Sequence, residues 1–342
     1  MKNPFNPAFG ALPEQFLGRD DIVDSFIDAI TNKNSPWRST LLIGVRGSGK
    51  TAILSQIQAK VMSKNTFVVS VSPETDFLDN ILGQLHKQIE MDDKNPSFTK
   101  TFRYQITDML DIVRKSGKDV VFLIDESQKH SEDLRTFIGT YQHLIRENYP
   151  ICLIIAGLPE VVSEILNDDV LTFFRRAHQV FLKNIGIPLV QQGFQNVFIN
   201  AIDNPPEVLL AEAARSTYGY PYLIQLIGYY LWENIQNSYP GDLLTQVLVE
   251  AKDRLFQNVH QLVYDKLSPK DKEFLFAMAQ DAGQSLNKDI IARLEKNKSY
   301  VSMYRARLIS YGVVTSKGYG TLGYTYPYMR EFLMEKRREL AL

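Results

Sequence analysis

The first half of the chain alternates short apolar runs with segments in which apolar residues recur every three or four positions. The runs are continuously apolar, which is typical of strands buried on both faces of a parallel sheet, and the segments between them have the period of amphipathic helices. This order predicts an α/β fold with a five-stranded parallel sheet as its core. The expected strands are 40–45, 67–72, 120–125, 151–157 and 179–184.

After about residue 186 the continuous apolar runs stop, and helical spacing continues alone in segments such as "PYLIQLIGYYLWENIQ". Proline and glycine at 204–206 and 239–241 interrupt this spacing and predict helix ends there. The pattern therefore predicts an all-helical second domain over residues 186–262, behind a first domain over residues 1–185. Pro4, Pro7 and Pro13 predict an extended arm at the start of the first domain.

A third pattern covers residues 263–342. Ser268 and Pro269 have the residue types of a helix start, and three short helical segments follow. Two strand-like runs around Gly318 and Gly320 then predict a β-hairpin. Three helices followed by a hairpin indicate a winged helix-turn-helix domain.

Composition restricts the class of protein. Apolar residues make up 44% of the chain and charged residues 23%, as in folded globular proteins. No apolar run approaches the roughly 20 residues needed to span a bilayer, and "MKNPFNPAFG" lacks the apolar core of a secretory signal. With Cys152 as the one cysteine, no internal disulfide can form. We expect a cytoplasmic protein without a membrane partner.

The net charge of −1 conceals an asymmetry between the ends of the chain. Residues 268–342 carry 13 lysines and arginines against 8 acidic residues, so the third predicted domain is basic. A basic domain suits a nucleic acid partner, although a solvated surface has the same composition.

The segment "GVRGSGKT" follows the first expected strand directly and precedes a helical segment. It matches the phosphate-loop pattern G-x-x-x-x-G-K-[ST], in which glycines let successive amides surround an anion. Lys50 is placed to reach the phosphates and Thr51 to give its hydroxyl to Mg²⁺. The candidate nucleotide-binding residues are Gly44, Arg46, Gly47, Ser48, Gly49, Lys50, Thr51 and Ala52.

The third expected strand ends in "FLIDES", which places two carboxylates at the carboxyl end of a strand. Ligands of parallel sheets bind at this end. We predict that Asp125 assists the metal ion and that Glu126 orients the attacking water, so that Thr51 and Asp125 form the Mg²⁺ site. An acidic pair after a strand is weak evidence alone, but it gains weight behind a phosphate loop.

With these motifs the chain resembles the AAA+ P-loop ATPases with a C-terminal winged helix, including bacterial relatives of archaeal origin-recognition initiators and of the STAND group. The resemblance rests on the two Walker motifs, "GVRGSGKT" and "FLIDES". It also rests on "NPFNPAFGALPEQFLGRDD", "FFRRAHQVFL" and "GYPYLIQLIG". It implies that the helical domain is a lid and that the cofactors are ATP or ADP with Mg²⁺. It also implies slow ATP hydrolysis, because Ala156, Gly157 and Tyr222 stand where relatives have polar sensor residues.

The resemblance further implies an adenine pocket near Phe16, Leu17, Gly18 and Arg19. It places an arginine finger at Arg175 or Arg176, which would require a homo-oligomer. A plain helix entry and a solvated basic pair are the structural alternatives, and the sequence leaves them open.

The third helix of the basic domain offers candidate DNA contacts. If Val301, Tyr304 and Leu308 face the core, small and basic side chains lie on the opposite face. These candidates for double-stranded DNA binding are Lys298, Ser302, Arg305, Arg307 and Lys317. The hypothesis is a nucleotide-controlled, DNA-associated ATPase. The alternatives are a STAND-type signalling ATPase whose winged helix contacts protein and a helper ATPase of a mobile element.

Overall fold

A computed structural model describes residues 2–8, 18–62, 66–73, 75–89, 101–125, 132–169, 171–199, 206–235 and 241–340. The chain divides into two compact units. We call Gly18–Gly44 with Gly49–Lys183 the sheet unit, and Met1–Leu17 with Val45–Ser48 and Asn184–Leu342 the helical unit. The phosphate-loop segment Val45–Ser48 thus belongs to the helical unit.

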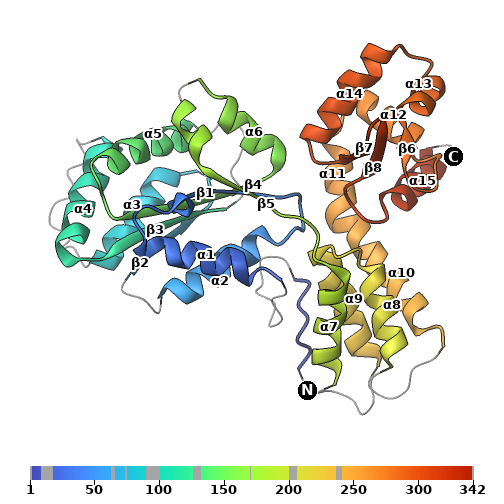
Figure 1. The fold of residues 1–342 in the computed structure, drawn as a ribbon, viewed down its shortest axis with the longest axis horizontal. Coiled ribbons are helices and arrows are strands. Elements are labelled where there is room, and N and C mark those ends of the chain that lie inside the picture. The colour runs from blue at the N-terminus through green and yellow to red at the C-terminus, as the bar shows by residue number, and fades with distance from the viewer. Residues whose placement is uncertain are drawn as a thin grey trace. The chain divides into compact units, whose positions relative to one another are not determined.

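The sheet unit contains a five-stranded sheet in the order β2-β3-β4-β1-β5, and every neighbouring pair is parallel (Figure 1). The α/β prediction is confirmed, since each strand starts within one residue of its expected position. Four of the strands end one to three residues before their expected carboxyl ends, and β4 ends at the expected residue. They are β1 (Ser39–Ile43), β2 (Thr66–Val71), β3 (Asp119–Ile124), β4 (Ile151–Gly157) and β5 (His178–Phe181).

Helices cover both faces of this sheet, and in Figure 1 α1 and α2 lie on the face opposite α5 and α6. The continuous apolar runs follow from this cover in β1, β3 and β4, whose residues are buried apart from the first residue of β1 and of β3, whereas the edge strand β5 is more exposed. The ring of Phe137 on α5 lies 5.3 Å from Phe122 on β3 and 5.9 Å from Phe77 on α3. The helices are α1 (Asp20–Thr31), α2 (Lys50–Met62), α3 (Phe77–Ile89), α4 (Phe102–Ser116), α5 (Glu132–Arg146) and α6 (Pro159–Asn167).

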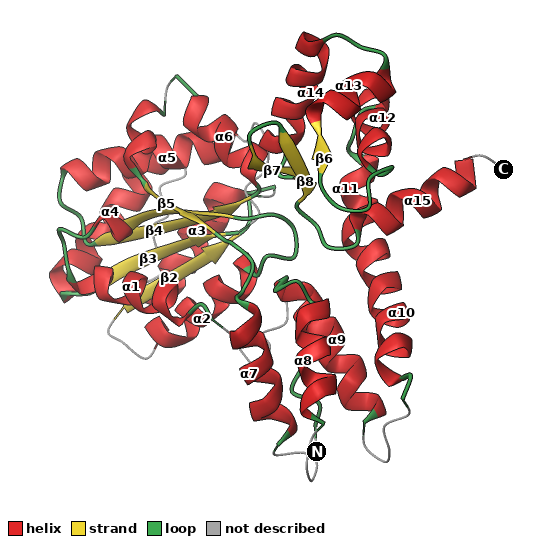
Figure 2. Ribbon diagram, turned by 45° about the vertical axis from the view of Figure 1, so that its right-hand side comes forward, coloured by secondary structure: helices red, strands yellow, loops and turns green. Residues whose placement is uncertain are grey.

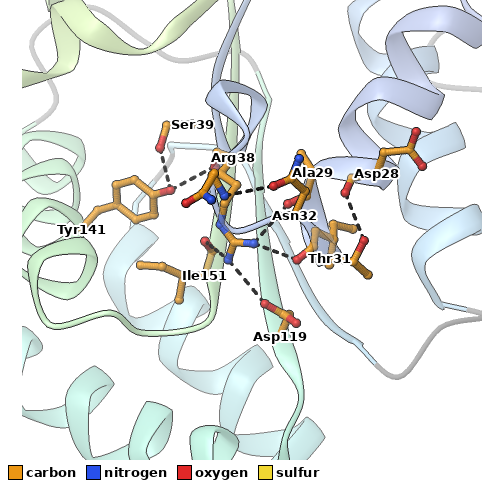
Figure 3. Close-up of polar contacts among 11 residues, drawn as sticks. Asp28, Ala29, Thr31, Asn32, Arg38, Ser39, Asp119, Tyr141 and Ile151 are labelled. Atoms are coloured by element: carbon orange, nitrogen blue, oxygen red, sulfur yellow. Dashed lines mark hydrogen bonds and ion pairs between the residues drawn. The ribbon is translucent and has the colours of Figure 1, made fainter.

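Arg38 joins four segments of the sheet unit at the amino end of β1 (Figure 3). Its guanidinium donates to the carbonyls of Ala29 and Ile30 at the end of α1, at 3.1 and 2.7 Å. It also donates to the carbonyl of Ile151 on β4 at 3.0 Å and lies 3.4 Å from Asp119 on β3. One planar fork therefore satisfies the end of a helix and fixes the starts of two strands.

The helical unit begins with helices that lack intervening strands, as the pattern after residue 186 predicts. The chain is helical without a break from Leu243 to Asp265, with a π-helical turn, η3 (Phe256–His260), in the middle. Such turns insert one residue into a helix and re-aim the side chains around it. The helices are α7 (Ile187–Phe198), α8 (Glu207–Ser216), α9 (Pro221–Asn234), α10 (Leu243–Leu255) and α11 (Gln261–Asp265).

The last part of the helical unit has three short helices, a hairpin and a final helix that the sequence analysis did not predict. Strand β6 pairs with β8, which extends the hairpin to a three-stranded sheet beside α12, α13 and α14 (Figure 2). The winged helix assignment stays a prediction. The elements are α12 (Pro269–Met278), β6 (Ser285–Leu286), α13 (Asn287–Leu294), α14 (Lys298–Ser310), β7 (Val314–Gly318), β8 (Thr321–Tyr324) and α15 (Met329–Leu340).

The described residues of the N-terminal arm pack against α7 and α9. Phe5 is 2% exposed, and its ring lies 5.6 Å from the ring of Phe194. A Cβ at Gly228 on α9 would lie 2.6 Å from Phe5 Cγ, so this helix position must be glycine for the arm to fit. Phe5 is therefore part of the core of the helical unit.

His260 lies fully buried in the π-helical turn, where its ring contacts Phe256, Tyr326 and Phe332 at 5.1 to 6.0 Å. Burial among these rings disfavours the imidazolium and lowers the pKa of His260 to about 3. The unfolded chain binds a proton near the ordinary pKa of about 6.5, so acid favours unfolding below that pH.

We predict that Arg38→Met lowers the free energy of unfolding of the sheet unit by about 2 to 4 kcal/mol, because buried carbonyls lose a charged donor. Urea denaturation in a Trp232→Phe background measures this, since Trp37 is then the remaining tryptophan and reports on the sheet unit. Lys60→Met is the control: its ion pair with Asp24 is exposed, so the expected loss stays within about 1 kcal/mol. Equal losses of unfolding free energy in Arg38→Met and Lys60→Met would contradict the role of Arg38 as a buried anchor.

We predict that His260 makes the helical unit less stable by about 2 kcal/mol at pH 5 than at pH 7.5, because only the unfolded state takes up the proton in this window. The measurement is urea denaturation at both pH values in a Trp37→Phe background, where Trp232 reports on the helical unit. In His260→Phe the same change of pH should cost about 2 kcal/mol less. An identical pH dependence in both proteins would show that His260 is not the responsible group.

Candidate active site

The turn between β1 and α2 holds the predicted phosphate-binding residues. Gly47 and Gly49 have φ values of +73° and +92°, in the left-handed region that favours glycine. The Gly44 amide donates to the Gly157 carbonyl on β4 at 3.2 Å, and the Ser48 amide donates to the Val45 carbonyl at 3.2 Å. The turn thus leaves the sheet at a defined point and curls back on itself before α2 begins.

Lys50 begins α2, and its side chain returns over the turn. The ammonium donates to the Gly44 carbonyl at 2.9 Å, and Lys50 is only 9% exposed. A buried ammonium beside the positive end of a helix favours an anion. The Ser48 hydroxyl is also buried and has no hydrogen-bond partner among the described residues. These two groups fit a polyphosphate ligand.

Thr51 and Asp125, the predicted metal site, lie in contact. Thr51 Oγ1 donates to Asp125 Oδ2 at 2.6 Å, so the first turn of α2 meets the residue after β3 although the two are 74 positions apart in the chain. The Asp125 amide donates to the Val71 carbonyl at 3.0 Å and so continues the β3 ladder onto β2. A hydroxyl and a carboxylate are the hard oxygen groups that Mg²⁺ takes together with substrate phosphates. The residues therefore fit the predicted ion.

The remaining predicted nucleotide-site residues either lie outside the described part of the chain or make contacts of their own. Glu126, Phe16 and Leu17 lie outside the described residues. Gly18 is exposed with a φ of +65°, and the Arg19 guanidinium donates to the Lys183 carbonyl. Burial lowers the pKa of Arg19. The hydrogen bond to Lys183 connects the residue before α1 to the chain after β5. Arg46, Gly47 and Ala52 are half-buried in and after the turn.

The two candidate finger arginines close a short 3₁₀ helix, η2 (Thr172–Arg176), before β5. Both are exposed, and Arg175 Nε donates to the Leu166 carbonyl at 2.6 Å. This bond fixes the side chain of Arg175 against its own subunit, whereas no such bond is described for Arg176. The choice between them stays a prediction.

Ala156, Gly157 and Tyr222 stand where the resemblance places polar sensor residues. Ala156 and Gly157 end β4 and are buried. Tyr222 instead contributes its backbone, since its amide donates to the Gly47 carbonyl at 3.2 Å while its hydroxyl accepts from Asn258 Nδ2 at 2.8 Å. Sequence reasoning missed its neighbour Tyr220, whose hydroxyl donates to the Arg46 carbonyl. The segment "GYPY" draws attention to Tyr220 in the sequence, but residue spacing alone does not reveal that its hydroxyl contacts the phosphate loop.

The candidate DNA contacts on α14 and β7 differ in their exposure and in their partners. Lys298, Ser302 and Lys317 are exposed, whereas Arg305 is half-buried. The Arg307 guanidinium lies 3.2 Å from the fully buried carboxylate of Asp271. Arg307 therefore compensates a buried charge of its own domain, a role that sequence reasoning did not foresee.

Two family models match the chain. Residues 34–165 match one described as an AAA domain, and residues 257–333 match one described as a domain of unknown function (DUF8462). The search of curated proteins finds no match.

Solved structures with the same architecture include the Walker-type ATPase PABY2304 of Pyrococcus abyssi, at 14% identity and a TM-score of 0.70, covering 94% of this chain and 97% of that chain. The Aeropyrum pernix ORC2 protein in its ADP form has 12% identity, a TM-score of 0.54 and coverages of 96% and 97%. Cdc6p from Pyrobaculum aerophilum has 15% identity, a TM-score of 0.50 and the same coverages.

The chain has a P-loop fold, and residues 34–165 match the AAA domain. The AAA match ends within α6 and so covers β1 to β4 with the phosphate loop and Asp125. An AAA+ fold implies nucleotide binding, usually with Mg²⁺. In the described part of the chain, no helix combines the length and apolar character that crossing a membrane requires.

We predict that Thr51→Val weakens nucleotide binding about tenfold in the presence of Mg²⁺ and less than twofold in EDTA, because the hydroxyl acts on the ion and not on the phosphates directly. Titration with a fluorescent ATP analogue under both conditions measures this. Thr107→Val on α4 is the matched control, since its hydroxyl donates only to the Arg103 carbonyl. An equal loss in EDTA would show that Thr51 acts without the metal.

Proposed function

We propose that the protein is a Mg²⁺-dependent ATPase that acts as a nucleotide-controlled switch and engages double-stranded DNA through its C-terminal domain. In this proposal residues 1–185 form the ATPase domain, 186–262 a lid and 263–342 a winged helix-turn-helix domain. The ATPase domain binds the nucleotide, the lid responds to it and the winged helix-turn-helix domain contacts DNA.

The hydrogen bond between Thr51 and Asp125 carries the proposal. It joins the end of the phosphate loop to the carboxylate after β3 at 2.6 Å, where a P-loop ATPase needs its metal-binding groups. The Lys50 ammonium, held at the Gly44 carbonyl, supplies the positive charge for the phosphates. Both contacts lie within the sheet unit, so the site's chemistry depends on β1 and β3, two strands of one sheet that β4 separates.

In the proposed mechanism the loop amides and Lys50 bind the phosphates and stabilise the charge that develops on transfer. Thr51 and Asp125 hold Mg²⁺, and Glu126 orients water for attack. Ala156, Gly157 and Tyr222 supply no side-chain donor to the γ-phosphate. Turnover is consequently slow, and a long-lived ATP state suits a switch better than a motor.

Adenine as the base is supported by the fold neighbour from Aeropyrum pernix, whose structure is an ADP form. We place the adenine pocket at Leu17, Gly18 and Arg19, before α1. Arg19 donates to the Lys183 carbonyl, so the entrance of α1 is attached to the chain that leaves β5. This hydrogen bond holds Arg19 in place beside the proposed adenine pocket.

Support for DNA comes from the outward face of α14. Ser299, Ser302, Met303 and Ala306 are all exposed, so the helices α7–α11 of the same unit leave this face uncovered. Small and hydroxyl side chains allow close approach to a groove, and Lys298 and Lys317 add positive charge at its edges. A STAND-type arrangement, in which the lid covers this face, is less well supported.

We also propose that ATP promotes homo-oligomers in which Arg176 or Arg175 reaches a neighbouring nucleotide. The exposure of both side chains supports this. Arg176 is the stronger candidate, because Arg175 is engaged by the Leu166 carbonyl.

We predict that the double variant Lys298→Gln/Lys317→Gln binds duplex DNA about 10-fold more weakly and lowers the slope of log affinity against log salt by about two, one per lost phosphate contact. Fluorescence anisotropy over a salt series measures both values. The control is Arg337→Gln/Arg338→Gln on α15, which removes the same charge from exposed positions of the same domain. Arg307 is left intact because its loss would strand the Asp271 carboxylate.

Equal weakening by both double variants would mean that net charge alone drives binding and would contradict a DNA site on α14. Nucleotide binding without any binding to DNA would contradict the DNA part of the proposal and leave the ATPase part standing.

A further inference from the structure

The turn between α8 and α9 touches two functional parts of the helical unit. On one side it contacts the phosphate-loop segment Val45–Ser48, and on the other it contacts residues 326–328 between β8 and α15. Tyr218 and Gly219 give the turn its shape, with φ values of +51° and +69°. A sharply bent segment of this kind transmits displacement better than a flexible loop, because few other conformations are open to it.

Two consecutive carbonyls of the phosphate loop are bound at the start of α9 (Pro221–Asn234). The Tyr220 hydroxyl donates to the Arg46 carbonyl, and the Tyr222 amide donates to the Gly47 carbonyl at 3.2 Å. When loop amides face an anion, the carbonyls of the same peptides face away from it and need donors elsewhere. The start of α9 supplies those donors, so it acts on the orientation of the peptides that would bind phosphate.

Burial makes Tyr220 suitable as such a donor. The residue is fully buried, and burial raises the pKa of its hydroxyl, so the group remains neutral and keeps its proton. A Cβ at Gly47 would lie 2.9 Å from Tyr220 Cζ and 3.1 Å from Tyr222 Cβ. The loop and the tyrosine therefore fit without spare room, and neither can move far without the other.

On its other side the Tyr220 ring packs edge-to-face on Tyr326, with ring centroids 6.2 Å apart. Tyr326 in turn lies 6.0 Å from His260, which contacts Phe332 on α15 at 5.4 Å. A second contact runs in parallel, since the Tyr328 hydroxyl donates to the Ser216 carbonyl at 2.9 Å. Buried rings in continuous contact connect the phosphate loop to α15 and to the π-helical turn.

We propose that Tyr220 is a positioning residue that couples the phosphate loop to the C-terminal domain: its hydroxyl holds the Arg46 carbonyl, and its ring passes displacement of the loop to Tyr326. The coupling rests on the proposed function, because a nucleotide must bind the loop to displace it. By linkage, it acts in both directions, so a ligand on the C-terminal domain changes the affinity for nucleotide by the same factor.

The test compares Tyr220→Phe with Tyr222→Phe, two deletions of a single hydroxyl at the start of one helix. Only the first removes a bond to the loop, because Tyr222 binds Gly47 through its backbone amide. Two quantities are measured for each protein: the affinity for a fluorescent ATP analogue, and the nucleotide-induced change in hydrogen exchange of peptides covering 321–333.

In Tyr220→Phe we expect affinity to fall about fivefold, since the Arg46 carbonyl loses its donor. The exchange response of 321–333 at saturating nucleotide should fall to less than half of that in the wild type. Tyr222→Phe should retain both. A third variant, Tyr326→Leu, should bind nucleotide within about twofold of the wild type yet lose the exchange response, because it breaks the connection beyond the loop.

A purely structural Tyr220 would lower stability but leave the nucleotide-induced exchange response intact, and that result would overturn the coupling. Normal nucleotide binding with equal responses in Tyr220→Phe and Tyr222→Phe would overturn the coupling alone. Failure of the wild-type protein to bind the ATP analogue would overturn the proposed function and the coupling with it.

Discussion

The turn between β1 and α2 is the constraint on which the remaining structure depends. Its left-handed glycines allow the chain to leave a buried strand, bend sharply and enter a helix within six residues. Every carbonyl so displaced needs a partner. Lys50 binds that of Gly44, while Tyr220 and Tyr222 bind those of Arg46 and Gly47. The surrounding residues are thus arranged by the hydrogen-bonding needs of one short backbone segment.

The two units solve the problem of burial differently. The sheet unit buries aliphatic strands between helices, and polar anchors such as Arg38 fix its edges (Figure 3). Both units also pack aromatic rings, and those of the helical unit reach across larger gaps and often carry a hydroxyl at one end. Tyr220, Tyr324 and Tyr328 all use this property, each donating to a backbone carbonyl from a packed ring. A core of this type links segments that are far apart in the chain.

Features that depend on residues close together in the chain could be predicted from the sequence, and most contacts between distant residues could not. The strands and the phosphate loop depend on local pattern and local backbone conformation, and all five strands start within one residue of prediction. The pairing of Thr51 with Asp125 was also predictable, because parallel strands bring their carboxyl ends to the same edge. Helix α15 and the π-helical turn were missed, since a polar helix and an inserted residue leave little trace in hydrophobic spacing. Arg307 was read as a free basic group because its partner, Asp271, is buried only by the fold.

The amino-acid sequence by itself therefore determined the α/β class, the order of strands along the chain and the chemistry of the phosphate loop. Each of these follows from residue type and short spacing. The tertiary structure alone decided which groups satisfy the loop's carbonyls, which arginines are engaged and how the aromatic rings of the helical unit connect. These contacts join residues that lie far apart in the chain, and their partners are selected by packing, which no local pattern encodes.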